Sequence, residues 1–159
     1  FFSFLFIFWI SSTALAYNNV HIFILVLSVC AFSDIGGFIV GKIVKGPKLT
    51  KISPNKTLSG VLGSFIFSLG SVFLLGFIVK SFVGMDSEIF NKPKYYFLAL
   101  LFSLIAQLGD LCISYLKRLE NLKDTGKMLP GHGGLFDRID GLMFVVIIAN
   151  ILYLLKLFP

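Results

Sequence analysis

The stretch VHIFILVLSVCAFSDIGGFIVGKIV, residues 20–44, carries the pattern that decides the fold. Its apolar side chains form a run long enough to cross a bilayer, because a spanning helix needs about 20 mostly apolar residues. A single aspartate, Asp34, interrupts this run, and Lys42 lies near its end. Four further apolar runs occupy most of the remaining chain. We therefore predict an all-α polytopic membrane protein with about five transmembrane helices.

The predicted spans are residues 1–17, 20–44, 58–79, 95–116 and 139–158. The first residue, Phe1, already lies inside an apolar run, so we expect this sequence to be the C-terminal part of a longer protein. The composition agrees with a membrane protein. Of the 159 residues, 57% are apolar and 14% are charged, whereas soluble domains average about 45–50% and about 25%. A soluble domain, a disordered tail and a nucleic-acid-binding module are thereby excluded, despite a net charge of +6.

Basic residues gather in the connection between the second and third spans and in that between the fourth and fifth. These two connections, which lie on the same side of the membrane, hold Lys42, Lys45, Lys48, Lys51, Lys56, Lys117, Arg118, Lys123, Lys127 and Arg138. Short loops rich in lysine and arginine stay in the cytoplasm. We predict that a functional site on this side faces the cytoplasm and has access to nucleotides.

Aspartates from three predicted spans lie at a matched depth near that side. Asp34 and Asp110 precede the nearest basic residue by eight and seven residues, which places them roughly 12 and 10 Å inside the span. Asp137 and Asp140 begin the last span, three residues apart and so on one helical face. Burying an aspartate near mid-bilayer costs on the order of 2.5–3.5 kcal/mol. The set therefore favours a cation site over separate lysine pairs or helix caps.

Oxygen ligands without cysteine or histidine favour Mg²⁺ over zinc. Magnesium in such sites usually keeps water and substrate phosphates as further ligands. The carboxylates therefore predict a site for a phosphate-bearing substrate.

Two connections could hold phosphate. In the first, Ser53-Pro54 is typical of a helix start, whose free N–H groups bind anions, and Lys56 and Thr57 add a cation and a hydroxyl. The alternative is that Ser53 only caps the third span while the lysines meet anionic lipid. In the second, residues 130–134 read Pro-Gly-His-Gly-Gly, where glycine lets the backbone approach a phosphate closely. We expect His132 to hydrogen-bond substrate rather than act as an acid or base.

Several motifs follow one another between residues 33 and 140. They are Ser33-Asp34-x-Gly36, Ile52-Ser53-Pro54-Asn55-Lys56-Thr57, Gln107-Leu108-Gly109-Asp110-Leu111, Ser114-x-x-Lys117-Arg118, Lys123-Asp124, and Leu129-Pro130-Gly131-His132-Gly133-Gly134 followed by Asp137-Arg138-Ile139-Asp140. In this order they resemble the signature of the phosphatidate cytidylyltransferases, or CDP-diacylglycerol synthases. That family usually has Trp-Glu-Gly after the Lys-Thr pair, where this chain has Leu58-Ser59-Gly60.

The resemblance implies that CTP and phosphatidic acid react to give CDP-diacylglycerol and pyrophosphate in phospholipid biosynthesis. It implies Mg²⁺, with or without a second cation, and one transmembrane catalytic domain over residues 1–159. The expected partners are CTP, phosphatidic acid and membrane lipid, with no nucleic acid, and a homodimer is compatible with the sequence. The expected location is the bacterial inner (plasma) membrane, with the active site facing the cytoplasm.

Residue roles follow from the same resemblance. The predicted metal ligands are Asp110 and Asp137, with Asp34 and Asp140 bound to the ion directly or through another ligand. The predicted catalytic residues are Asp110, Asp137, Lys117 and Arg118. The predicted substrate-binding residues are Ser53, Lys56, Thr57, Lys123, Asp124, His132, Gly133, Gly134 and Arg138.

Three alternatives remain open. A CTP-dependent kinase of polyprenol or phytol, or a synthase acting on an archaeal-type ether lipid, would also place CTP beside a lipid. A cation channel or transporter is the third, since intramembrane aspartates often mark ion pathways. Transport predicts carboxylates throughout the membrane depth, whereas those of this chain lie on the predicted cytoplasmic side.

Overall fold

The computed structural model describes residues 2–50, 56–83, 92–120 and 136–157, with the backbone alone described for residues 2–4, 82–83 and 136–138. Within these ranges the chain is helical and contains no strand. The elements are α1 (Phe2–Asn18), α2 (Val20–Val44), α3 (Leu58–Ile78), the π-helical segment η1 (Val79–Val83), α5 (Pro93–Leu119) and α6 (Phe136–Leu154). The predicted all-α fold and the five predicted helices are confirmed.

Three of these helices are long and apolar enough to cross a membrane in the part of the chain that is described. They comprise Val20–Val44, Leu58–Ser81 and Pro93–Leu119, while α1 and α6 contribute the shorter apolar runs Leu5–Asn18 and Ile139–Leu154. Large apolar side chains such as Trp9, Phe73 and Phe97 are exposed on the outside of the bundle. Such surfaces suit lipid, because helices satisfy their backbone polar groups internally. The chain is an integral membrane protein.

Two predicted boundaries moved. Helix α5 runs to Leu119, so Lys117 and Arg118 form its last turn instead of belonging to the connection. Cations are stabilised at this end of a helix, where the backbone carbonyls point outward. Helix α6 begins at Phe136 and ends at Leu154, so it starts earlier and stops sooner than the predicted span 139–158.

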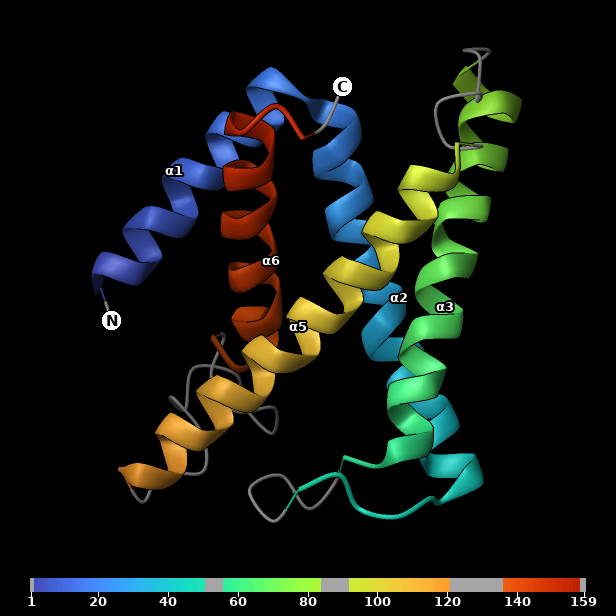
Figure 1. Ribbon diagram of the computed structural model, residues 1–159, viewed down its shortest axis with the longest axis vertical. Coiled ribbons are helices and arrows are strands. Elements are labelled where there is room, and N and C mark those ends of the chain that lie inside the picture. The colour runs from blue at the N-terminus through green and yellow to red at the C-terminus, as the bar shows by residue number, and fades with distance from the viewer. Residues whose placement is uncertain (1, 51–55, 84–91, 121–135, 158–159) are drawn as a thin grey trace.

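The helices pack as a bundle in which one member crosses the others (Figure 1). Helices α2 and α3 run side by side and form the most extensive helix pair. Helix α5 passes diagonally across the bundle and contacts α2, α3 and α6, while α1 packs on α6 and α2. The crossing brings the middle of α5, from Ala106 to Asp110, close to the second half of α2 and to the first turns of α3 and α6.

Glycines set the close approach of α2 and α3. A Cβ built on Gly63 would lie 2.6 Å from the carbonyl oxygen of Gly36 and 2.5 Å from Cβ of Val40. A Cβ on Gly60 would lie 2.9 Å from the carbonyl oxygen of Gly37. Small residues allow this contact between membrane helices, where packing drives association. The two backbones therefore touch along the segment that carries the site.

Candidate functional site

Two cavities lie next to each other among these helices. The first cavity has a volume of about 300 Å³ and is lined by Ser33, Asp34, Gly37, Phe38, Lys56, Thr57, Gly60, Val61, Ser64, Ala106, Gln107 and Asp110. The second cavity has a volume of about 180 Å³ and is lined by Cys30, Asp34, Ala106, Asp110, Asp140, Gly141 and Leu142. Because Asp34, Ala106 and Asp110 line both, these residues form the boundary between the two cavities.

Aspartates from three helices line the second cavity. Asp34 comes from α2, Asp110 from α5 and Asp140 from α6. Asp140 is 8% exposed, and its carboxylate accepts a hydrogen bond from the backbone N–H of Gly141 at 2.8 Å. Asp110 accepts one from the hydroxyl of Ser114 at 3.3 Å. The structure thus brings together three of the four aspartates that the sequence placed at one depth.

The ammonium group of Lys56 forms an ion pair with the carboxylate of Asp110. Local pairing in the connection between α2 and α3 explains how Lys56 arrives there. The backbone N–H of Leu49 donates to the carbonyl of Lys56 at 2.8 Å, and the N–H of Leu58 donates to that of Pro47 at 3.0 Å. These bonds hold the end of the connection antiparallel to its beginning, so that Lys56 enters the first cavity from the start of α3.

The start of α3 corrects one expectation. Residues 51–55 lie outside the description, but α3 begins at Leu58, and its cap is Thr57 instead of Ser53. The Thr57 hydroxyl accepts the N–H of Gly60 at 3.1 Å. The prediction of a helix starting at Ser53-Pro54 was wrong because backbone pairing holds Lys56 and Thr57 outside the helix, with an extended backbone at Thr57.

Ser59 stands where the family that the motifs resemble usually has glutamate. Its hydroxyl accepts the N–H of Gly46 at 3.1 Å and shares a hydrogen bond of 3.0 Å with the hydroxyl of Thr57. These contacts tie the end of α2 to the first turn of α3. Ser59 therefore stabilises the connection that carries Lys56.

Deeper in the first cavity lies a neutral hydrogen-bonding cluster. The hydroxyls of Ser33 and Ser103 pair at 2.8 Å, and the hydroxyl of Ser64 donates to the carbonyl of Ser33 at 2.8 Å. The amide nitrogen of Gln107 donates to the Ser103 hydroxyl at 3.3 Å. Ser33 and Gln107 belong to the motifs of the sequence analysis, which assigned them no role. Their signal was a small or polar side chain within an otherwise apolar span.

The charged side chains of the site interact electrostatically with one another. Asp34 and Asp140 each interact electrostatically with Asp110 and with Lys56, and Asp140 also interacts with Lys117. Three carboxylates facing the Lys56 ammonium leave an excess of negative charge among oxygen donors. Hard divalent cations such as Mg²⁺ bind in such surroundings.

The donor set therefore fits a divalent cation in chemical type. Among the described residues, no three histidine, cysteine or acidic side chains lie close enough to hold one ion together. An ion here would take one or two carboxylates and complete its coordination with water or substrate phosphate, as Mg²⁺ commonly does.

The remaining predicted residues fall into three groups. Lys117 and Arg118 lie on the last turn of α5, beyond the described lining of the two cavities. Asp137 and Arg138 lie on the first turn of α6, where the backbone alone is described, while Ser53, Lys123, Asp124, His132, Gly133 and Gly134 lie outside the described residues.

Comparisons with known proteins agree with the motifs. The model of the cytidylyltransferase family matches residues 1–156. A phosphatidate cytidylyltransferase of Helicobacter pylori is 41% identical over 132 residues, covering 82% of this chain and 47% of the relative. The proteins of that name from Rickettsia conorii and Brucella suis are 39% and 40% identical, over 137 and 123 residues. These alignments cover 86% and 77% of this chain, and 56% and 42% of the relatives.

The chain spans about half the length of these relatives. The family match nevertheless extends over nearly all of its residues, including every helix described above. The resemblance carried by the motifs is thereby confirmed, and the chain belongs to the cytidylyltransferase family.

Proposed function

We propose that this chain, as a single transmembrane catalytic domain, transfers the CMP moiety of CTP to phosphatidic acid, producing CDP-diacylglycerol and pyrophosphate. The observation that carries the proposal is the ion pair between Lys56 and Asp110 at the boundary of two cavities. The Lys56 ammonium could bind a phosphate group, and the neighbouring carboxylates could bind a metal ion. The names of the relatives support the choice of reaction.

The chemistry requires positioning and charge stabilisation. An oxygen of the lipid phosphate attacks the α-phosphorus of CTP, and the bond from that phosphorus to the bridging oxygen of the β-phosphate breaks. The bonding electrons leave with pyrophosphate, so negative charge grows on the departing group. No covalent intermediate with a side chain is needed, and preorganised cations lower the barrier.

Lys56 and Asp110 have complementary roles in this scheme. The Lys56 ammonium would exchange Asp110 for a phosphate of CTP and neutralise charge during transfer. Asp110, with Asp34 or Asp140, would hold Mg²⁺, which supplies Lewis-acid stabilisation of the phosphate oxygens when bound. The hydroxyl of Thr57 lines the same cavity and can donate a hydrogen bond to a phosphate.

The other predicted contacts complete the proposal. Lys117 and Arg118, at the basic end of α5, would attract the anionic substrates. Asp137 as a metal ligand remains a prediction, as do the substrate contacts Ser53, Lys123, Asp124, His132, Gly133, Gly134 and Arg138. The concentration of lysine and arginine in two connections on one side supports a site that faces the cytoplasm. The bacterial inner membrane remains a prediction. A homodimer and a second cation also remain predictions.

The test is an assay of the full-length protein in detergent with CTP and phosphatidic acid, measuring pyrophosphate and CDP-lipid with and without Mg²⁺. Asp110→Asn should reduce turnover by at least about 100-fold, since it weakens both metal binding and charge balance. Glu120→Gln is the matched control, because Glu120 is exposed at the end of α5. Near-normal turnover of Asp110→Asn would refute the site. Release of CDP with a phosphorylated lipid would instead identify a kinase.

A further inference from the structure

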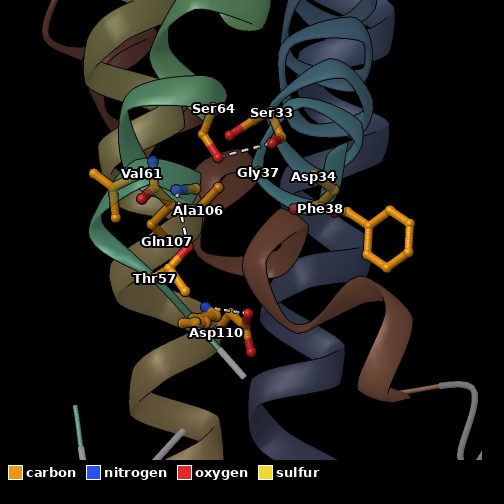
Figure 2. A pocket seen from close by; sticks show the side chains of 12 residues that line it. Ser33, Asp34, Gly37, Phe38, Thr57, Val61, Ser64, Ala106, Gln107 and Asp110 are labelled. Atoms are coloured by element: carbon orange, nitrogen blue, oxygen red, sulfur yellow. Dashed lines mark hydrogen bonds and ion pairs between the residues drawn. The ribbon is translucent and has the colours of Figure 1, made fainter. Parts of the chain in front are cut away.

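The two ends of the first cavity differ chemically. Lys56 and Asp110 make one end charged, whereas Ser33, Ser64 and Gln107 offer neutral hydrogen-bonding groups, and Asp34 lies between the serines and Asp110 (Figure 2). Figure 2 shows Ser33 and Ser64 at the opposite end of the view from Asp110, and Gln107 lies between these serines and Asp110. We infer that the neutral end is a pocket for the nucleobase of the nucleoside triphosphate, in which Gln107 selects the amino-pyrimidine edge of cytosine over uracil. This inference rests on the proposed function and names the group that reads the base.

The spacing along α5 suits a nucleotide. Gln107 precedes Asp110 by three residues, which corresponds to a rise of about 4.5 Å along the helix. In a nucleotide the ribose and the pyrimidine ring lie between the α-phosphate and the base edge that Gln107 would contact, and the length of the Gln107 side chain adds to this rise. Phosphates held at Lys56 and Asp110 would therefore place the base beside Gln107 and the serines.

A hydrogen-bonded chain orients the Gln107 amide. Its nitrogen Nε2 donates to the hydroxyl of Ser103 at 3.3 Å, and that hydroxyl pairs with Ser33 at 2.8 Å. Both serines are at least 99% buried. Within the described part of the chain, Oε1 of Gln107 receives no hydrogen bond. The carbonyl oxygen and the second amide proton are thus available to a ligand in the cavity.

This pattern complements cytosine. The N4 amino group of cytosine would donate to Oε1, and ring nitrogen N3 would accept from Nε2, much as glutamine pairs with the amino group and adjacent ring nitrogen of adenine. Uracil presents the reverse order, an acceptor at O4 and a donor at N3. To read uracil the amide would have to turn over, so that Ser103 donates to Oε1 instead of accepting from Nε2, and Ser103 could then pair with Ser33 only as the acceptor.

An acyl chain does not suit this end of the cavity. Covering Gln107 with hydrocarbon would leave its carbonyl oxygen without water or a partner, which costs free energy. The apolar outer faces of the helices, such as the exposed rings of Phe73 and Phe97, offer lipid tails a better surface. The phosphate of the lipid substrate would meet CTP at the charged end.

The experiment compares CTP with UTP as substrates of the full-length protein in detergent, with phosphatidic acid and Mg²⁺. The wild type should prefer CTP. In Gln107→Ala, kcat/KM for CTP should fall about tenfold or more through a higher KM, and the ratio of CTP to UTP should fall about tenfold, as expected for lost base-specific hydrogen bonds. Gln107→Glu is a second variant, because it keeps the chain length but replaces the Nε2 donor with an acceptor, and it should lower the same ratio.

Ser68→Ala is the matched control. Ser68 is fully buried, donates to the carbonyl of Phe65 within its own helix and is absent from the described lining of the first cavity. Its substitution should leave the CTP-to-UTP ratio unchanged. A wild-type ratio in both Gln107 variants, or equal use of CTP and UTP by the wild type, would overturn the base pocket alone. A wild type that releases pyrophosphate from neither nucleotide would refute the proposed function and the pocket together.

Discussion

Replacing Gly63 by alanine should both destabilise the protein and disturb its site, because this glycine lies where α2 and α3 touch. The new Cβ would lie 2.5 Å from Cβ of Val40 and 2.6 Å from the carbonyl oxygen of Gly36. Carbon atoms pack favourably at about 3.5–4.0 Å, so the two helices would have to separate locally by roughly 1 Å. Overpacking of this kind costs about 1–3 kcal/mol.

Gly70 provides the matched control on the same helix. A Cβ at Gly70 would meet nothing within 4 Å, so Gly70→Ala keeps the gain in helix preference, up to about 1 kcal/mol, without the clash. The difference between the two variants isolates the packing cost. At about 2–4 °C per kcal/mol for a chain of 150–250 residues, Gly63→Ala should melt about 2–12 °C below Gly70→Ala.

Thermal unfolding in detergent and CTP turnover measure the two effects separately. Separating α2 from α3 moves Thr57 and Lys56 relative to Asp34, and a misplacement of about 1 Å can reduce a rate by about 100-fold. Gly63→Ala should therefore lose turnover at temperatures where it is still folded, whereas Gly70→Ala should keep it. Equal melting temperatures and equal turnover in the two variants would refute the packing argument.

Two further outcomes test individual charges. Lys56→Met should raise KM for CTP and reduce kcat/KM by roughly 10–150-fold, the range for a charge-assisted hydrogen bond to phosphate. Lys80 lies on η1 at the far end of α3, so Lys80→Met should have little effect. Equal kinetics in the two variants would contradict the role of Lys56. Asp140→Asn should raise the Mg²⁺ concentration needed for half-maximal turnover by about 10–100-fold, as measured by titrating Mg²⁺ after EDTA treatment. An unchanged half-maximal Mg²⁺ concentration would show that Asp140 does not belong to the ion site.

The sequence predicted the helices well because the bilayer imposes their length and composition. The span 20–44 coincides with α2, since the apolar run ends at a cluster of lysines. Counting residues back from the basic ends placed Asp34 and Asp110 at one depth, and both line the same cavities. The sequence alone thus predicted that these two aspartates from different helices lie at the same level of the bundle.

The contacts between neighbouring helices could not be predicted from the sequence in the same way. The hydroxyl pair Ser33–Ser103 joins residues 70 positions apart, and nothing in either span identifies the other as its partner. The cap of α3 was misplaced for a related reason. Ser53-Pro54 and Thr57 are both plausible helix starts, and it is the antiparallel bridge between Lys48 and Thr57 that favours the second.

The close packing of α2 and α3 explains how an acidic site can exist inside an apolar bundle. Asp34 and Asp140 each repel Asp110, and water near the bilayer interior does little to screen these charges. The Lys56 ion pair offsets part of this repulsion, while the Gly36–Gly63 contact and the Ser33–Ser103 bond hold the helices together. The negative charge that remains lowers the stability of the ion-free protein, and relief of that repulsion adds to the free energy of binding a divalent cation. The serine and glycine positions thus contribute to ion affinity without touching the ion.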